Sequence, residues 1–102
     1  MKSLLDIQRQ LTVGEFEFSR HAFRRTVERN ISERKIQEAG AKAEIIEDYP
    51  NDKYLPSSLC FGFTAAGRSL HFQVSYDKWG LTKIITIYEP DQNEWIDYRK
   101  RR

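Results

Sequence analysis

His71 is the residue of this 102-residue sequence whose type and position best suit acid–base chemistry. It lies in the middle of segment 69–76, where polar and apolar residues alternate, so Gln73 and Ser75 share its face of a predicted strand. An imidazole with a pKa of about 6.5 can give or take a proton at neutral pH. We expect Tyr88 on the same face, where its hydroxyl could bind phosphate or act as an acid. The alternative is that both rings only pack across the sheet.

A second group of polar side chains lies on segment 20–29, whose spacing predicts a helix. His21 and Arg25 are four residues apart, so both project from one side of that helix and could contact the same anion. The guanidinium of Arg25 is a planar fork of donors that suits phosphate. Arg25 could instead pair with Glu28 as an ordinary helix neighbour, and the helix could equally pack behind the sheet.

These residue types suit the metal-free cleavage of a phosphodiester. In that reaction one group deprotonates a ribose 2′-hydroxyl, cations stabilise the charge at phosphorus, and another group protonates the leaving oxygen. The candidate catalytic residues are His71, His21 and Tyr88, and the candidate substrate-binding residues are Arg25, Lys83 and Gln73. No Gly-rich phosphate loop, H-E-x-x-H or G-x-S-x-G motif occurs, so we expect no cofactor. The cysteine and two histidines lack metal-ligand spacing, so we also expect no metal.

Periodicity predicts the elements that position these residues. Helices are expected at 3–11, at 20–29, from Ser32 onward, and after Pro90, where a final helix would carry Trp95 and Tyr98. Strands are expected at 58–64, 69–76 and 82–88, with turns at 65–68 and 77–80. Segment 45–49 is a β-prone run, and 15–18 alternates polar and apolar residues, a weak strand signal. The predicted fold is therefore α+β, with helices on one face of an antiparallel sheet of three to four strands and a C-terminal helix.

The alternation also predicts which side chains face the helices. Leu70, Phe72 and Val74 should point inward, and the apolar set Leu59, Phe61 and Phe63 lies on one face of its strand. The other face should be open to a ligand and hold Cys60, Gly62, Thr64, His71, Gln73, Ser75, Thr86 and Tyr88. Cys60 has no obvious base beside it, so we expect it to pack rather than to act as a nucleophile.

Composition fits one folded domain of residues 1–102, because 39% of the residues are hydrophobic and 13% are aromatic. No apolar run reaches the roughly 18 to 20 residues of a membrane span, so the cytoplasm is the expected compartment. The net charge is only +2, but residues 19–35 carry six arginine or lysine residues against two glutamates. The chain also ends in four basic residues, 99–102. Such basic segments suit RNA, although a solvated helix face is the alternative.

Four segments of the sequence resemble a family of small bacterial proteins known as domain of unknown function 4258. They are F-S-R-H-A-F-R-R-T-V-E-R-N-I-S (18–32), E-I-I-E-D-Y-P (44–50), G-R-S-L-H (67–71) and I-I-T-I-Y-E-P-D (84–91). The resemblance covers about residues 16–95. It implies a likeness to the RelE and barnase-like ribonuclease toxins, and a gene placed beside that of an antitoxin-like zinc-finger protein.

Carried over by position, the family pattern marks His21, Arg25, the pair Glu28 and Arg29, His71, and the Y-E-P segment 88–90. Arg29 thereby joins the candidate substrate-binding residues. The sequence departs from the family at Asn30, where glycine is usual, and has an unusual glycine at position 40. Neither position holds a candidate catalytic group.

The leading hypothesis is a metal-independent endoribonuclease of toxin type. His71 would be its general base or acid, Tyr88 or His21 its partner, and Arg25 with Lys83 would bind phosphate. RNA and a cognate antitoxin would be its partners. The alternative is a non-catalytic RNA-binding or protein-interaction module that uses the same face and the basic helix. A third hypothesis is that the open face is a homodimer interface.

Overall fold

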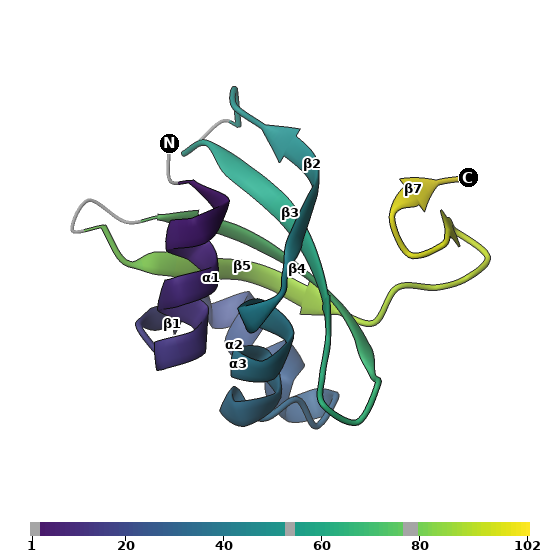
Figure 1. Ribbon diagram of the computed structural model, residues 1–102, viewed down its shortest axis with the longest axis horizontal. Helices are drawn as coiled ribbons and strands as arrows, with labels where there is room; N and C mark the ends of the chain where they lie inside the picture. Colours follow the sequence, from purple (N-terminus) through teal and green to yellow (C-terminus); the bar gives the residue numbers. More distant parts are fainter. Residues whose placement is uncertain (1–2, 53–54, 77–79) are drawn as a thin grey trace.

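Three helices and a five-stranded sheet form the main body of the computed structural model, which describes residues 3–52, 55–76 and 80–102 (Figure 1). The helices are α1 (Leu4–Val13), α2 (Arg20–Glu28) and α3 (Glu33–Ala41). The strands of the sheet are β1 (Phe16–Phe18), β2 (Glu44–Tyr49), β3 (Ser57–Phe63), β4 (Ser69–Tyr76) and β5 (Thr82–Tyr88). A separate hairpin of β6 (Trp95–Ile96) and β7 (Lys100–Arg101) follows the sheet. The turn predicted at 77–80 lies largely outside the described residues.

A serine caps the start of each helix. The hydroxyl oxygens of Ser3, Ser19 and Ser32 accept hydrogen bonds from backbone N–H groups in the first turns of α1, α2 and α3. Such a cap contributes about 1 kcal/mol, because it satisfies a donor that has no partner within the helix. The hydroxyl of Ser19 also donates to the backbone oxygen of Ile85, over 2.7 Å. This one side chain therefore both starts α2 and attaches it to β5.

The sheet has the strand order β1-β5-β4-β3-β2, in which β1 runs parallel to β5 and the other pairs are antiparallel. The prediction of a purely antiparallel sheet of three to four strands is therefore wrong. The short segment 16–18 pairs with residues 82–84, and a strand of three residues carries too little periodicity to indicate a partner so far along the chain.

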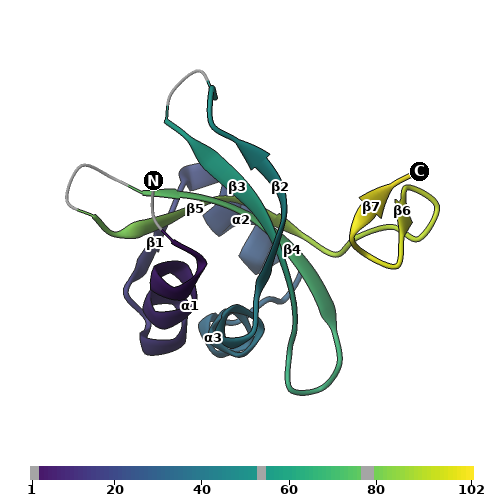
Figure 2. The same cartoon turned by 45° about the horizontal axis from the view of Figure 1, so that its top comes forward.

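The predicted C-terminal helix is also wrong, because residues 95–101 form the β6–β7 hairpin. Asp97 and Tyr98 have φ angles of 51° and 62°, in the left-handed region, where a right-handed helix cannot continue. The sequence is compatible with a helix, because of the proline at position 90 and the spacing of Trp95 and Tyr98. It gives no sign of the left-handed turn at 97–98. In Figure 2 the hairpin lies on the opposite side of β4 from α1.

The core lies between the helices and one face of the sheet. Ile36 and Ala39 of α3 and Leu11 of α1 pack with Phe72 of β4 and Ile87 of β5. The pairing of β4 with β5 shifts register between Gln73 and Val74, so that Ile84 and Ile87 are both buried in this core. An irregularity of this kind is a β-bulge, and it interrupts the strict alternation expected for 82–88.

The predicted facing of β3 is wrong. Cys60 pairs with Phe72 and Phe61 pairs with His71, and directly paired residues share a face of the sheet. Cys60 and Gly62 therefore face the helices, whereas Leu59 and Phe61 lie on the face of His71. The missing side chain at position 62 lets the backbone of α3 approach β3.

Gly62 provides the test of this packing. A Cβ at position 62 would overlap the carbonyl oxygen of Ala39, so α3 would have to move away from the sheet. We expect Gly62→Ala to lower the free energy of unfolding by about 3 kcal/mol, the upper end for overpacking, in urea unfolding. The contrasting variant is Gly67→Ala, whose methyl group would have no atom within 4 Å and whose φ of 86° costs about 1 kcal/mol. Equal losses in the two variants would contradict the close approach of α3.

Candidate functional site

Four of the predicted site residues lie on the sheet face that points away from the helices. The strand register places His71, Gln73, Lys83 and Tyr88 there, since each alternates with residues that face the core. Glu47 and Tyr49 of β2 lie on the same face, opposite Leu59 and Ser57 of β3. We call this the distal face, defined by Glu47, Tyr49, Leu59, Phe61, His71, Gln73, Lys83 and Tyr88.

The β6–β7 hairpin covers part of the distal face. The ring of Trp95 lies edge-on to that of His71, with centroids 4.5 Å apart. The ring of Tyr98 stacks on that of Phe61 at 5.5 Å, with 12° between the planes. The face that we expected to be open is therefore open only toward its other end, where Gln73 and Lys83 lie.

His71 is fully buried beneath this hairpin, with none of its surface exposed. Its Nε2 lies 2.6 Å from the carbonyl oxygen of Tyr98, and its Nδ1 lies 3.2 Å from the hydroxyl of Tyr88. A carbonyl oxygen only accepts, so Nε2 carries the proton and Nδ1 accepts from Tyr88. Burial lowers the pKa of His71, although the Tyr98 carbonyl and Glu47 favour its charged form. The ring is thus neutral at pH 7, and its predicted role in proton transfer stays a prediction.

Glu47, Tyr49 and Arg101 form a charged cluster beside His71. The guanidinium of Arg101 donates to both carboxylate oxygens of Glu47, over 2.8 and 3.1 Å, and the hydroxyl of Tyr49 donates to the same carboxylate. These hydrogen bonds, above all that from Arg101, hold the pKa of Glu47 below its usual value, so the carboxylate stays ionised. Burial raises the pKa values of Tyr49 and Tyr88, so both hydroxyls keep their protons.

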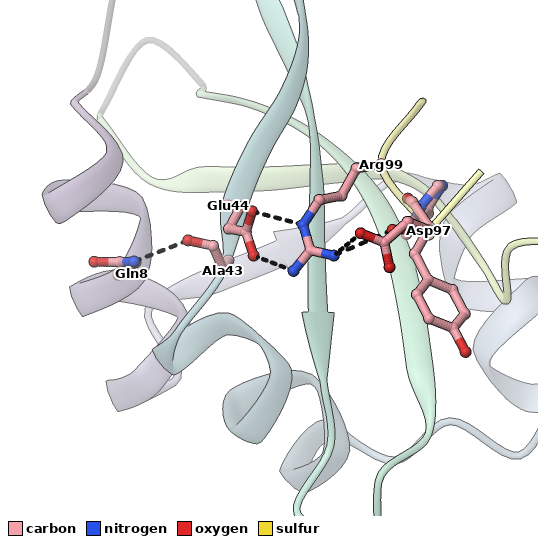
Figure 3. Close-up of polar contacts among 7 residues, drawn as sticks. Gln8, Ala43, Glu44, Asp97 and Arg99 are labelled. Carbon is pink, nitrogen blue, oxygen red and sulfur yellow. Dashed lines mark hydrogen bonds and ion pairs between the residues drawn. The ribbon is translucent and has the colours of Figure 1, made fainter. Parts of the chain in front are cut away.

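A second ion pair joins the hairpin to β2. Arg99 donates from Nε and Nη2 to the two carboxylate oxygens of Glu44, over 3.0 and 2.8 Å (Figure 3). The same guanidinium also reaches Asp97, within the hairpin turn. Glu44 and Glu47 thus each bind one arginine of the hairpin in the same bidentate way. In both cases an acidic residue of β2 meets a basic residue of the C-terminal segment.

Two hollows occupy the end of the distal face that the hairpin leaves uncovered. One has a volume of about 520 Å³ and is lined by Tyr49, Pro50, Asn51, Asp52 and Gln73. The other has a volume of about 290 Å³ and is lined by Ser19, Asp52, Leu55, Ser75, Lys83 and Ile85. The Asp52 carboxylate, shared by both, accepts hydrogen bonds from Ser57 and Gln73. Among the described residues, no three His, Cys, Asp or Glu side chains cluster as metal ligands would.

The other predicted site residues lie on α2 or at its end, away from His71. Ala22 of this helix packs in the core with Phe72, which faces the opposite side of β4 from His71. His21 is exposed on α2. Arg25 pairs with Glu28 at 3.3 Å, as an ordinary helix neighbour would. The structure therefore does not bring His21, Arg25 or Arg29 to the distal face.

Cys60 lies in the core and not on the face where the alternation placed it, but it packs as expected. Burial, with a smaller effect of Asp48, raises the pKa of its thiol to about 12. The thiolate is therefore absent at neutral pH, and Cys60 is not a nucleophile in this fold.

Three residues of the cluster were missed in the sequence: Glu47, Tyr49 and Arg101. Glu47 and Tyr49 have the spacing of a shared strand face, which is a usable signal, but the register shift after Ile45 hides which face it is. Arg101 lies 54 positions from Glu47, in the basic segment 99–102, where no strand was expected. No local pattern could have brought those two residues together.

Three of the segments that carry the family resemblance meet at Arg68, in the turn between β3 and β4. Its guanidinium donates to the backbone oxygens of Arg29 and Asn30, over 2.7 and 2.9 Å, and to the carboxylate of Glu89. Arg68 thus holds the end of α2, the β3–β4 turn and the end of β5 together. Asn30 itself has a φ of 53°, a conformation that glycine adopts more easily.

The lowered pKa of His71 predicts that the free energy of unfolding depends on pH. Because burial lowers this pKa below its usual value of about 6.5, the unfolded chain takes up the proton first as the pH falls. The stability that the neutral ring supports is therefore present above about pH 6.5 and is lost below it. We expect the difference in unfolding free energy between wild type and His71→Gln to shrink from about pH 7.5 to about pH 5. A difference that stays constant in urea unfolding would contradict the neutral ring.

Comparison with known proteins supplies the family. A family model described as "Domain of unknown function (DUF4258)" matches residues 18–89, a segment that ends before the β6–β7 hairpin. The curated proteins and the solved structures contain no significant match to the chain. In the part of the chain that the structure describes, no helix has the length and apolar character needed to span a membrane. Since the matched segment covers most of its length, the chain belongs to the DUF4258 family of domains of unknown function.

Proposed function

We propose that this protein is a metal-independent endoribonuclease of toxin type, with its active site on the distal face. The observation that carries this proposal is the cluster formed by Glu47, Tyr49, Tyr88 and Arg101 next to a hollow of about 520 Å³. An ionised carboxylate, a guanidinium and protonated hydroxyls are the groups that cleavage of RNA by acid–base catalysis requires.

Each group has a role in this reaction. The Glu47 carboxylate takes the proton of the ribose 2′-hydroxyl, and the 2′-oxygen then forms a bond to phosphorus. Arg101, which is well exposed, stabilises the negative charge that develops on the phosphate oxygens. The bond from phosphorus to the 5′-oxygen breaks, and this oxygen takes a proton from Tyr88. Glu47 then releases its proton to water and Tyr88 regains one from water, so both groups return to their starting states. The products are a 2′,3′-cyclic phosphate and a free 5′-hydroxyl.

The remaining residues of the distal face would bind and position. Gln73 and Lys83 border the two hollows and would contact nucleotides next to the cleaved bond. His71 would act as a positioning residue, because it accepts the hydrogen bond that fixes Tyr88 and donates the one that fixes the hairpin. RNA and a cognate antitoxin protein are the partners in this proposal, and the cytoplasm is the compartment.

The test compares two matched carboxylates. Glu47→Gln removes the proposed base but keeps its size, and we expect the rate of cleavage of a single-stranded RNA in EDTA to fall at least ~100-fold. Glu44→Gln is the control, since Glu44 also pairs with an arginine of the hairpin from the same strand. It should retain the wild-type rate within about threefold, a small effect beside the loss of a catalytic base. Circular dichroism melting confirms that both variants are folded.

Two results would contradict the proposal: a wild-type protein that leaves the RNA intact, or equal rates in the two variants. The first result, combined with measurable RNA affinity, would support the second candidate function, a non-catalytic RNA-binding module. The burial of His71, with both ring nitrogens already bonded, is the observation that favours this second candidate.

A further inference from the structure

The outward side of α2 exposes two large apolar side chains. Ala22 and Thr26 are buried, and the next residues, Phe23 and Val27, are 58% and 68% exposed. Phe23 and Val27 are four positions apart, so they lie one turn from each other on the same side of the helix. In an amphipathic helix of a monomeric protein this side would carry polar residues.

This apolar surface continues from α2 onto the edge of the sheet. The ring of Phe23 lies 6.1 Å from that of Phe18, and the ring of Phe18 lies 5.6 Å from that of Phe16. Phe16 and Phe18 belong to β1, the edge strand of the sheet, and both are partly exposed. The patch formed by Phe16, Phe18, Phe23 and Val27, which we call the α2 patch, is thus larger than two isolated side chains.

Two arginines flank the α2 patch along the helix. Arg20 lies three positions before Phe23 and Arg24 lies three positions before Val27, so each arginine is a helix neighbour of one apolar residue of the patch. Both are exposed, and neither makes an ion pair with another of the described residues. The patch therefore has an apolar centre and a basic rim whose charges have no partner among those residues.

We propose that the α2 patch is a docking surface for an acidic amphipathic segment of a partner protein. The apolar side of such a segment would cover Phe23 and Val27, and its carboxylates would pair with Arg20 and Arg24. Protein is favoured over RNA because Phe16 and Phe18 also pack against the core and Val27 is aliphatic, so Phe23 is the one well-exposed ring of the patch on which a base could stack. The inference does not depend on the proposed ribonuclease activity, since α2 covers the face of the sheet opposite to Glu47 and Tyr88.

The test measures peptide binding by fluorescence anisotropy. The probe is a labelled peptide of about four helical turns, with leucine on one side and glutamate on the other, and its counterpart has lysine in place of glutamate. We expect the acidic peptide to bind the wild type at least ~10-fold more tightly than the basic one. The double variant Phe23→Ser/Val27→Ser should weaken this binding at least ~10-fold. Leu5→Ser is the matched control, because Leu5 is an apolar residue of α1 that is 76% exposed.

Three outcomes would overturn the proposal. In the first, the acidic and basic peptides bind equally, or the double variant binds the acidic peptide as well as the Leu5→Ser control. In the second, the double variant loses affinity for single-stranded RNA and not for the peptide, which would make the patch a nucleic-acid surface. In the third, sedimentation shows a wild-type dimer that the double variant dissociates, which would make the occupant a second copy of this chain.

Discussion

The carbonyl oxygen of Tyr98 accepts a hydrogen bond from Nε2 of His71, and the arrangement of the distal face depends on this contact. It attaches the β6–β7 hairpin to the middle of β4, a strand with which the hairpin forms no backbone ladder. Only a docked hairpin brings Arg101 to Glu47 and Arg99 to Glu44. The bond also fixes the tautomer of His71, which leaves Nδ1 to accept from Tyr88. The buried imidazole of His71 thus fixes the positions of Arg101 and Tyr88 in the candidate site.

The parts of the fold that depend on near neighbours were visible in the sequence. The strict alternation of 69–76 predicted β4, and the serines at positions 19 and 32 predicted the starts of α2 and α3. The features that were missed depend on distant partners or on single-residue irregularities. The parallel pairing of β1 with β5 joins segments 66 positions apart, and the bulge that places both Ile84 and Ile87 in the core has no periodic signal.

The same distinction applies to the candidate site. Alternate positions of one strand share a face, so His71 and Gln73 of β4 could be grouped by counting, and Tyr88 was expected beside them. Lys83 could not be grouped in this way, because strict alternation puts it on the face opposite to Tyr88, and only the β-bulge brings both residues of β5 to the distal face. Phe61 was placed wrongly because an aromatic residue in a strand usually indicates the core, and here Tyr98 supplies the cover that a core would give. The residue pattern of a helix shows which of its sides is buried, but it does not show which face of the sheet the helix covers. The sequence therefore left open whether the residues of α2 join the site or lie behind the sheet, and the structure places them behind it.

The parallel pairing of β1 with β5 also determines when the fold can be completed. Phe16 lies beside Thr82, 66 positions later, so the first strand to be synthesised waits for the last strand of the sheet. Until β5 emerges from the ribosome, one edge of β4 is unpaired and Phe16 and Phe18 have no core in which to pack. Contacts between such distant segments slow folding, because a long loop must close before they form. The aromatic side chains of β1 are therefore without their partner strand throughout most of synthesis, and the edge of β4 stays unpaired from the time that β4 is made until β5 follows it. In this state contact with a chaperone or another chain is most favourable.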